Sequence, residues 1–155
     1  MAASQRDAIR SFCLRSLSRR EHGRFELKER LRGQGYSGRE VDEVLDELVA
    51  KGWQSDERFA REYSRMRIRK GNGPLRIRHE LRERGIEDVP LDDFIQDLYS
   101  DWDELIEHVH RKRFGDALPD TYQERAKRSC FLQYRGFTPE QIRTLFARMT
   151  PSRRP

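Results

Sequence analysis

The sequence has no long apolar run and very little cysteine. No stretch among its 155 residues approaches the roughly 20 consecutive apolar residues that cross a bilayer, and residues 1–12 hold no apolar run of a secretory signal. Its two cysteines, Cys13 and Cys130, lie far apart within apolar helical patterns, so we expect two buried free thiols and no disulfide. We therefore expect a soluble, cytoplasmic protein.

The sequence also lacks the motifs of a catalytic or metal site. Residues 33–38 match the GxGxxG dinucleotide fingerprint, but that fingerprint follows a β-strand, and here it follows a helical pattern at residues 25–32. The P-loop motif GxxxxGK[ST] is absent. The four histidines are dispersed, and His108 and His110 diverge on one helix, whereas two zinc ligands on a helix are usually four residues apart. We therefore expect neither an enzyme nor a metal or cofactor site.

Charged residues make up 38% of the chain, against 35% hydrophobic residues, and the net charge is +5. So few apolar residues would fill a thick core poorly, whereas a row of small helical units needs only one apolar stripe per helix. Disorder is the alternative, but the apolar residues recur at regular spacing and include eight Phe, five Tyr and two Trp. The positive charge favours a polyanionic partner such as nucleic acid.

The sequence repeats itself with a period of about 50 residues. Gly35, Gly85 and Gly136 are each followed by an apolar residue, a polar helix start, and apolar residues at positions i, i+3, i+4 and i+7. These helical stripes are Val41, Val44, Leu45 and Leu48; Leu91, Phe94, Ile95 and Leu98; and Ile142, Leu145, Phe146 and Met149. Three matches at a nearly constant offset predict three copies of one structural unit.

Each copy has two further helical stripes before its glycine. The first helices carry Ile9, Phe12, Cys13 and Leu17; Phe59, Tyr63 and Met66; and Trp102, Leu105, Ile106 and Val109. The middle helices carry Leu27 and Leu31, then Ile77 and Leu81, then Leu132. Arg128 stands where the third copy should have an apolar residue, so we expect its middle helix to rotate and to bury Ala126, Cys130 and Phe131.

These stripes predict an all-α fold, an elongated array of three tandem three-helix repeats. The expected boundaries are residues 4–53, 54–100 and 101–150, followed by a frayed tail at residues 151–155. No segment sustains an alternation of apolar and polar residues, so no sheet is expected.

Helix start and stop signals fit this partition. Ser37 with Glu40 is a capping box, and residues 138–141 (TPEQ) are another, with proline at the first helical position. Ser55 or Asp56 can cap the helix that follows. The glycines of the three turns suit the left-handed residue that ends a helix.

Residues 61–84 carry more than the net charge of the entire chain, with nine Lys or Arg against three Glu. In their middle, residues 70–74 (KGNGP) end one helix and begin another, so two basic helices meet at a tight corner. The candidate partner- or DNA-binding residues are Arg61, Arg65, Arg69, Lys70, Arg76, Arg78, Arg82 and Arg84, with Arg111, Lys112 and Arg113 as a second cluster. Arg61, Arg65 and Arg69 form one expected exposed row, and Arg76, Arg78 and Arg82 another. The alternative is that these rows only solubilise the helices and pair with Glu62, Glu80 and Glu83.

From about residue 8 to residue 149, the chain resembles the RecX family of bacterial recombination regulators. The segments that carry the resemblance are residues 20–22 (REH) with 26–27, 55–60 (SDERFA), 70–74 (KGNGP) with 76–77, 80–81, 85–86, 112–115 (KRFG), and 131–132 leading to 135–137 (RGF). One departure is Gly23, which stands where many members have a serine cap. It should weaken that helix start by only a few tenths of a kcal/mol.

The resemblance implies the same array of three three-helix units. It also implies a protein that binds the RecA recombinase, chiefly its filament on single-stranded DNA, lies in the filament groove, and restrains ATP hydrolysis, filament extension and strand exchange. The family has no catalytic motif, so the candidate contact residues rest on charge and exposure alone.

The alternative function is a basic helical-repeat protein that binds DNA without RecA, through helix-turn-helix elements. Such a reader needs Asn, Gln or Arg on one recognition-helix face and usually acts as a dimer. The third helices, at residues 40–49, 91–99 and 141–149, are acidic or mixed. We therefore expect a monomer that acts on RecA, with only weak direct DNA binding.

Overall fold

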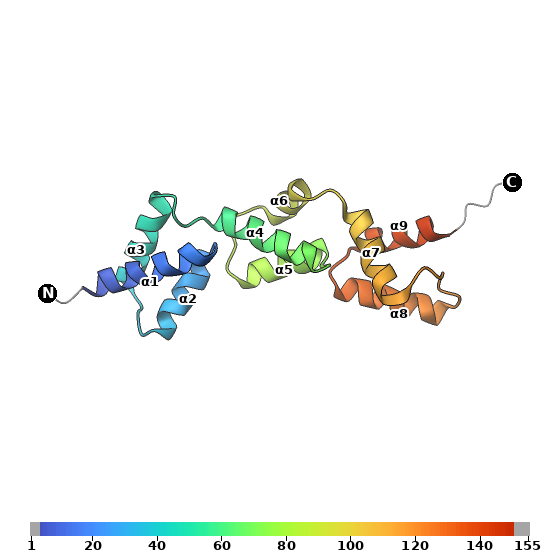
Figure 1. The fold of residues 1–155 in the computed structure, drawn as a ribbon, viewed down its shortest axis with the longest axis horizontal. Helices are drawn as coiled ribbons and strands as arrows, with labels where there is room; N and C mark the ends of the chain where they lie inside the picture. The colour runs from blue at the N-terminus through green and yellow to red at the C-terminus, as the bar shows by residue number, and fades with distance from the viewer. Residues whose placement is uncertain (1–3, 151–155) are drawn as a thin grey trace. The chain divides into compact units, whose positions relative to one another are not determined.

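The chain is entirely helical in the computed structural model, which describes residues 4–150 (Figure 1). Nine helices and no strand lie within those residues, which confirms the predicted all-α fold. The helices are α1 (Gln5–Arg19), α2 (Arg24–Gly33), α3 (Arg39–Ala50), α4 (Asp56–Arg69), α5 (Pro74–Glu83), α6 (Leu91–Leu98), α7 (Trp102–Phe114), α8 (Tyr122–Tyr134) and α9 (Pro139–Met149). The predicted tail at residues 151–155 lies outside the described residues.

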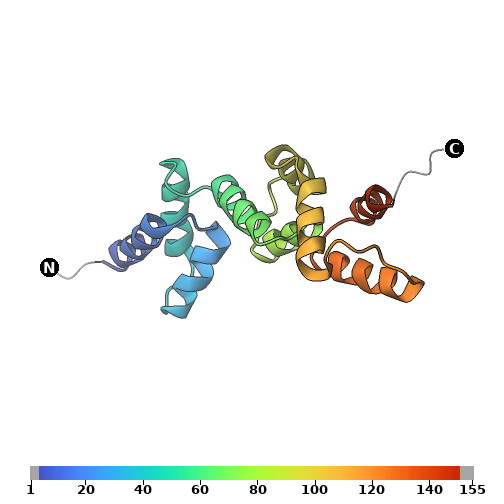
Figure 2. The ribbon, with the colours of Figure 1, turned by 45° about the vertical axis from the view of Figure 1, so that its right-hand side comes forward.

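The helices form two compact units. The first unit comprises residues 1–63 and 81–89, and the second comprises residues 64–80 and 90–155. Helices α1, α2 and α3 pack on one another in the first unit, as α7, α8 and α9 do in the second (Figures 1 and 2). Helices α4 and α5 each contribute residues to both units. The boundaries expected for the three repeats stay a prediction.

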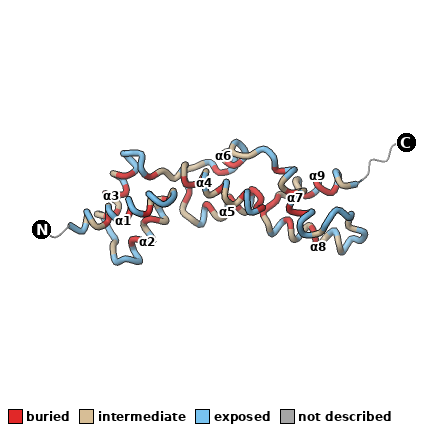
Figure 3. Tube along the Cα trace, in the orientation of Figure 1, coloured by how far each residue is buried: buried red, intermediate tan, exposed pale blue. Residues whose placement is uncertain are grey.

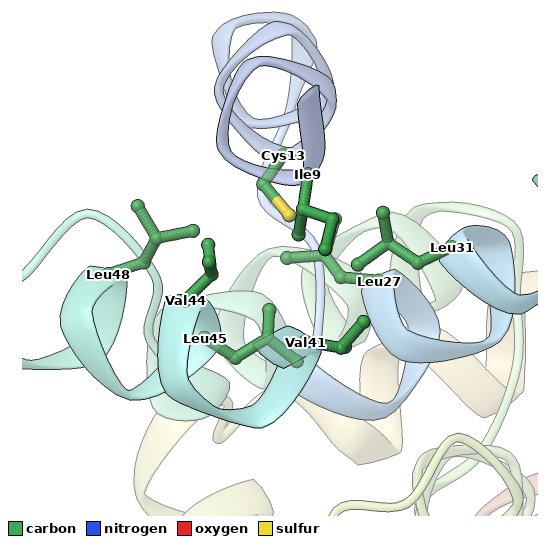
Figure 4. Packing of buried hydrophobic residues seen from close by; sticks show 8 residues of the cluster. All are labelled: Ile9, Cys13, Leu27, Leu31, Val41, Val44, Leu45 and Leu48. Carbon is green, nitrogen blue, oxygen red and sulfur yellow. The ribbon is translucent and has the colours of Figure 1, made fainter. Parts of the chain in front are cut away.

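The core of the first unit is one apolar stripe from each of three helices. Buried positions alternate with exposed ones along the helices (Figure 3). The side chains of Ile9, Cys13, Leu27, Leu31, Val41, Val44, Leu45 and Leu48 meet at the centre of α1, α2 and α3 (Figure 4). All four positions of the α3 stripe are at most 1% exposed, as their spacing predicts. Burial also raises the pKa of the Cys13 thiol to about 11, which keeps the thiol protonated.

The second unit has an equivalent core. Ile106 and Val109 of α7, Leu132 of α8, and Leu145 and Phe146 of α9 are buried together with Ile142. In α6, Leu91 and Ile95 are buried, while Phe94 and Leu98 are half-buried. Burial therefore follows the predicted stripes in both units.

Helix α8 is not rotated as the sequence led us to expect. Arg128 is buried with Leu132, whereas Cys130 is exposed and Ala126 and Phe131 are only half-buried. The predicted rotation and the predicted burial of Cys130 are therefore wrong. The helix keeps the register of the other two copies and buries the arginine that stands in that register.

Arg128 can be buried because its guanidinium group has partners there. Its Nε donates to Glu124 at 3.0 Å and its Nη1 donates to the carbonyl oxygen of Ala117 at 2.6 Å. The group also lies 5.2 Å from the ring centre of Phe114 and its Nη1 lies 3.3 Å from Nε2 of His110. A buried charge with partners on several sides is tolerated, whereas an unpaired one is not.

The helix caps agree with the sequence at one capping box and differ at the other. Thr138 accepts from the backbone N–H of Gln141 at 3.0 Å and its own N–H donates to the Gln141 side chain at 2.8 Å, which confirms that capping box. The box predicted at Ser37 is wrong: α3 begins at Arg39, its cap residue is Gly38, and no side chain caps it. Ser37 lies one residue before this cap residue, which is too early for its side chain to serve as the cap.

Helix α2 is capped from another helix. Ser55 accepts from the N–H of Arg58 at 3.2 Å and so caps α4. The neighbouring Asp56 instead accepts from the N–H of Arg24, the first residue of α2, at 2.9 Å. The cap residue of α2 itself, Gly23, has no side chain to offer. Asp56 therefore accepts from one of the first N–H groups of α2, which have no partner within the helix, whereas a serine at position 23 would accept from Phe25 or Glu26.

The three turn glycines have the predicted positive φ but different surroundings. Their φ angles are 90° at Gly35, 79° at Gly85 and 102° at Gly136. A Cβ atom at Gly35 would meet nothing within 4 Å. At Gly85 it would lie 2.5 Å from Cβ of Phe25, and at Gly136 it would lie 2.7 Å from the backbone nitrogen of Arg76. Real Cβ atoms do not approach so closely.

These close contacts recur between neighbouring repeats. Phe25 is the second residue of α2 and Arg76 is the third residue of α5, so each is near the start of a repeat's middle helix. The glycine turn of the next repeat packs against that start: Gly85 on α2 within the first unit, and Gly136 on α5 within the second. Gly35 belongs to the first copy and packs against no earlier one. The positive φ therefore favours glycine at all three positions, and close packing requires it as well at Gly85 and Gly136.

Alanine at these positions should separate the two requirements. We expect Gly35→Ala to lower the free energy of unfolding by only the left-handed backbone strain, about 1–2 kcal/mol. Gly85→Ala and Gly136→Ala should each lower it further, by about 1–3 kcal/mol, because the new Cβ also overlaps the preceding repeat. Urea denaturation followed by circular dichroism measures the difference. Equal losses at all three positions would mean that the packing at Gly85 and Gly136 adjusts freely.

The cap supplied by Asp56 can be tested in the same way. Asp56→Ala should lower the free energy of unfolding by about 1 kcal/mol because α2 loses its acceptor. Asp56→Asn is the matched control, since it removes the charge from the first turn of α4 but keeps an oxygen acceptor. Thermal denaturation should rank the parent and Asp56→Asn above Asp56→Ala. If Asp56→Asn is as unstable as Asp56→Ala, the loss of stability comes from the missing charge and not from the missing acceptor.

Candidate functional site

The corner between α4 and α5 is held by backbone hydrogen bonds within the second unit. Asn72 is buried, and both its backbone N–H and its side-chain Nδ2 donate to the carbonyl oxygen of Arg67 at 3.0 Å, which closes the end of α4. The N–H of Gly73 donates to the Arg135 carbonyl at 2.8 Å and that of Leu75 donates to the Gly136 carbonyl at 2.9 Å. The corner is therefore fixed to the turn between α8 and α9.

Arg76 also takes part in this contact. It is half-buried, its Nε donates to Glu80 at 3.1 Å and its Nη1 donates to the Tyr134 carbonyl at 3.3 Å. Its guanidinium group also lies 4.9 Å from the ring centre of Tyr134. The expectation that Arg76 is exposed is wrong, because the turn at Gly136 packs directly against its backbone.

Glu80 also binds Arg67, which sequence reasoning did not single out. Two guanidinium nitrogens of Arg67 lie 2.8 Å from the Glu80 carboxylate oxygens, and the two side chains are only 18% and 13% exposed. Arg67 and Arg76 therefore share one partly buried carboxylate. No sequence signal marks this pair, because Arg67 and Glu80 lie on different helices and meet only through the corner.

Four further candidates are engaged in contacts of their own. Arg61 pairs with Glu57 at 3.2 Å, Arg78 with Asp92 at 2.7 Å and Arg111 with Asp116 at 3.0 Å. Arg84 lies 4.5 Å from the ring centre of Tyr63. Arg61 and Arg78 are half-buried, which differs from the expected exposure. The alternative of internal pairing thus describes part of the basic set, although most of the partners are not the three glutamates expected.

The remaining candidates are exposed and have no ion pair with any of residues 4–150. They are Arg65, Arg69, Lys70, Arg82, Lys112 and Arg113. We call these six residues the exposed basic set. Arg65 and Arg69 lie one turn apart on α4 and are followed directly by Lys70, all in the second unit. Arg113 also lies 5.4 Å from the ring centre of Phe131. Exposed guanidinium and ammonium groups of this kind can bind carboxylates or phosphates.

Burial lowers the pKa of two histidines below the ordinary value of 6.5. His22 in the first unit and His110 in the second are each 2% exposed. Desolvation is the main cause of the lowered pKa in both, and the charge of Arg128 lowers the pKa of His110 further. Both imidazoles are therefore neutral at neutral pH. Among residues 4–150, no group of His, Cys, Asp and Glu side chains is placed to hold a metal ion.

Two pairs of the segments that carry the family resemblance contact one another. In the first unit, Arg58 donates to Glu21 at 2.9 Å and the side chain of Gln54 donates to the His22 carbonyl at 3.1 Å, so residues 20–22 are bound to residues 54–58. In the second unit, residues 70–75 are bound to residues 135–136, with Arg135 also donating to the Lys70 carbonyl at 3.1 Å. These two pairs of segments therefore form contacts between successive repeats.

Three family models match the chain in the same order as its repeats. The RecX first three-helix domain matches residues 10–48, the second matches residues 55–89 and the third matches residues 101–146. The chain belongs to the RecX family. This confirms the resemblance seen in the sequence and gives the three-helix units their family equivalents.

RecX relatives match over nearly the whole chain. A protein named Regulatory protein RecX from Halorhodospira halophila is 38% identical over 146 residues, which cover 94% of this chain and 91% of the relative. Another of that name from Pseudomonas fluorescens is 37% identical over 140 residues, which cover 90% of each chain. The names describe regulators and mention no catalytic activity.

Two solved RecX structures share the fold. The crystal structure of RecX from Lactobacillus salivarius has a TM-score of 0.71 at 21% identity and covers 93% of this chain and 96% of its own. A second crystal structure of regulatory protein RecX has a TM-score of 0.77 at 22% identity over 91% of this chain and 71% of its own. Among the helices within residues 4–150, none combines the length and apolarity that a membrane span requires.

The buried histidines of this RecX chain should make its stability depend on pH. Because the pKa of His22 and His110 is lower in the folded state, the unfolded chain takes up protons first as the pH falls below about 6.5. We expect the thermal midpoint to fall between about pH 7.5 and about pH 5.5. The thermal midpoint of the His110→Gln variant should fall less over the same pH range. A parent midpoint that does not change with pH, or a variant midpoint that changes as much as the parent's, would contradict this account.

Proposed function

We propose that this chain regulates a RecA recombinase by binding the RecA protein and its filament on single-stranded DNA. In this role it restrains ATP hydrolysis, filament extension and strand exchange, performs no catalysis of its own, and acts as a monomer. The observation that carries the proposal is the match of all three RecX domain models, in order, to one chain. Relatives named Regulatory protein RecX over most of the chain support the regulatory role.

A repeat architecture suits a filament as a partner. A filament presents the same subunit surface again and again, and successive repeats of a regulator can engage successive subunits. We propose that the predicted units, residues 4–53, 54–100 and 101–150, act in this way. Binding spread over several units keeps each contact modest while the sum becomes strong.

We propose that the exposed basic set makes these contacts, with Arg82 in the first unit and the other five residues in the second. Its six side chains have no ion pair within residues 4–150, so binding a carboxylate or phosphate breaks no internal pair. Arg76 and Arg78 would first have to leave Glu80 and Asp92. Arg61, Arg84 and Arg111 are likewise engaged, and we propose that these five residues stabilise the helices.

The proposed surface can be tested by reversing its charge. The variant carries Arg65→Glu, Arg69→Glu and Arg82→Glu and leaves Arg76 in place, because Arg76 holds the corner. The matched control carries Arg39→Glu, Lys127→Glu and Arg143→Glu, three exposed residues that also lack ion pairs within residues 4–150. Both variants should melt like the parent, as surface substitutions usually do.

The DNA-stimulated ATPase of RecA provides the readout. We expect the first variant to need roughly tenfold more protein for half-inhibition, and the control to stay within about twofold of the parent. If the first variant is folded and inhibits as well as the parent, Arg65, Arg69 and Arg82 do not make the contacts, and Lys112 and Arg113 are the next residues to test. Tight, sequence-specific duplex binding without any effect on RecA would instead favour the DNA-binding alternative.

A further inference from the structure

A basic cavity lies in the first unit, and no residue of the exposed basic set lines it. It has a volume of about 440 Å³ and lies between the second half of α1, the loop after it, and α2. Its wall includes Phe12, Arg15, Arg19, Arg20, His22 and Arg30. The α1 residues of the wall, positions 12, 15, 16 and 19, share one face because they follow the i, i+3, i+4, i+7 spacing of a helix. No acidic side chain lines the cavity.

Three of its arginines form no ion pair with a described residue, although the charge of Arg30 also acts on Glu26 one turn before it in α2. Arg15, Arg19 and Arg30 are exposed and make no ion pair with residues 4–150, whereas Arg20 is held by Glu26 through two bonds of 3.0 Å. The negative end of the α1 dipole favours basic residues in its last turn, which accounts for Arg19. Arg30 lies in the last turn of α2, where the same effect applies, and the fold brings it to the same cavity as Arg19.

The remaining wall is an aromatic ring and a neutral imidazole. Phe12 is half-buried, so its ring packs on the core of the first unit and borders the cavity at the same time. Nδ1 of His22 lies 3.0 Å from the Arg20 carbonyl, and since a carbonyl only accepts, Nδ1 carries the hydrogen. Nε2 of His22 is buried and has no partner within residues 4–150. The positive charge of the cavity is thus supplied by arginine alone.

We propose that this cavity binds a nucleotide of single-stranded nucleic acid, with its phosphate against Arg15, Arg19 and Arg30 and its base against Phe12. Guanidinium groups match the oxygens of a phosphate, and an aromatic ring beside them stacks any base without selecting a sequence. An acidic peptide would satisfy the arginines but would leave the ring unused. The volume falls within the roughly 300–1,000 Å³ of ligand cavities.

The binding test uses the full chain, fluorescent oligothymidylate and oligouridylate, and no recombinase. One variant carries Arg15→Glu, Arg19→Glu and Arg30→Glu. The control carries Arg39→Glu, Lys127→Glu and Arg143→Glu, which change the net charge by the same amount. We expect the affinity of the cavity variant to fall roughly tenfold, and its salt slope to decrease by about 0.7 for each phosphate that it no longer binds. The control should keep most of the parent's affinity and salt slope.

Two further measurements protect the test against misfolding and non-specific charge effects. If the cavity variant does not melt like the parent, the variant with Gln at the same three positions replaces it, because Gln removes the charge without reversing it. Proton NMR of the parent follows the imidazole signals during addition of oligothymidylate. The signal of His22, assigned from its disappearance in His22→Gln, should shift, and that of His110 in the second unit should not.

The outcomes separate this proposal from the regulatory one. Oligonucleotide affinity that falls equally in cavity variant and control would overturn the nucleotide site, and so would movement of His110 alone. A cavity variant that binds both oligonucleotides normally but no longer binds the RecA filament would show that the cavity takes an acidic protein segment, which also overturns it. Loss of ATPase inhibition in the Arg65, Arg69 and Arg82 variant leaves the nucleotide site untouched. Binding to only one of the two oligonucleotides supports the site and shows that it distinguishes them by the sugar 2′-hydroxyl or by the 5-methyl group of thymine.

Discussion

The close packing of one repeat's turn on the next repeat's middle helix is the constraint on which the rest of this structure depends. At Gly85 and Gly136 the chain approaches the preceding repeat so closely that a single Cβ atom would overlap it. Within the second unit, this approach brings the backbone of residues 73–75 into hydrogen-bonding distance of residues 135–136. The corner between α4 and α5 is thereby set by backbone geometry, and the basic residues on either side take their positions from it.

Because of that corner, some arginines of the basic stretch are paired within the protein and others are exposed to solvent. Arg67 and Arg76 both reach Glu80 because the corner folds α5 back beside α4, so both guanidinium groups form ion pairs within the protein. Arg65 and Arg69 lie on the same α4 helix but point to solvent. Neighbouring arginines in one basic stretch thus stabilise the fold or remain available for a partner, depending only on which face of the helix they occupy.

Two departures from the repeat pattern are compensated by partners that other segments supply, together with Glu124 on the same helix as Arg128. Gly23 provides no cap, and the carboxylate of Asp56 caps α2 in its place. Arg128 occupies an apolar position, and Ala117, Glu124 and Phe114 satisfy its guanidinium group there. In both cases a polar group that would be costly alone is stabilised because another segment brings a matching partner.

Local spacing in the sequence was enough to establish the helices, the repeat and the family. Apolar residues at i, i+3, i+4 and i+7 can bury only one face of a helix, and the glycines at 35, 85 and 136 already indicate the left-handed turns. Which charges are paired was settled only by the tertiary fold. Arg76 and Arg78 were expected at the surface, Cys130 in the core and Ser37 at a cap, and each depends on contacts or backbone angles that no local pattern specifies. The cavity at Arg15, Arg19 and Arg30 likewise exists only because α2 folds back beside α1 and brings basic residues from two helices to one place.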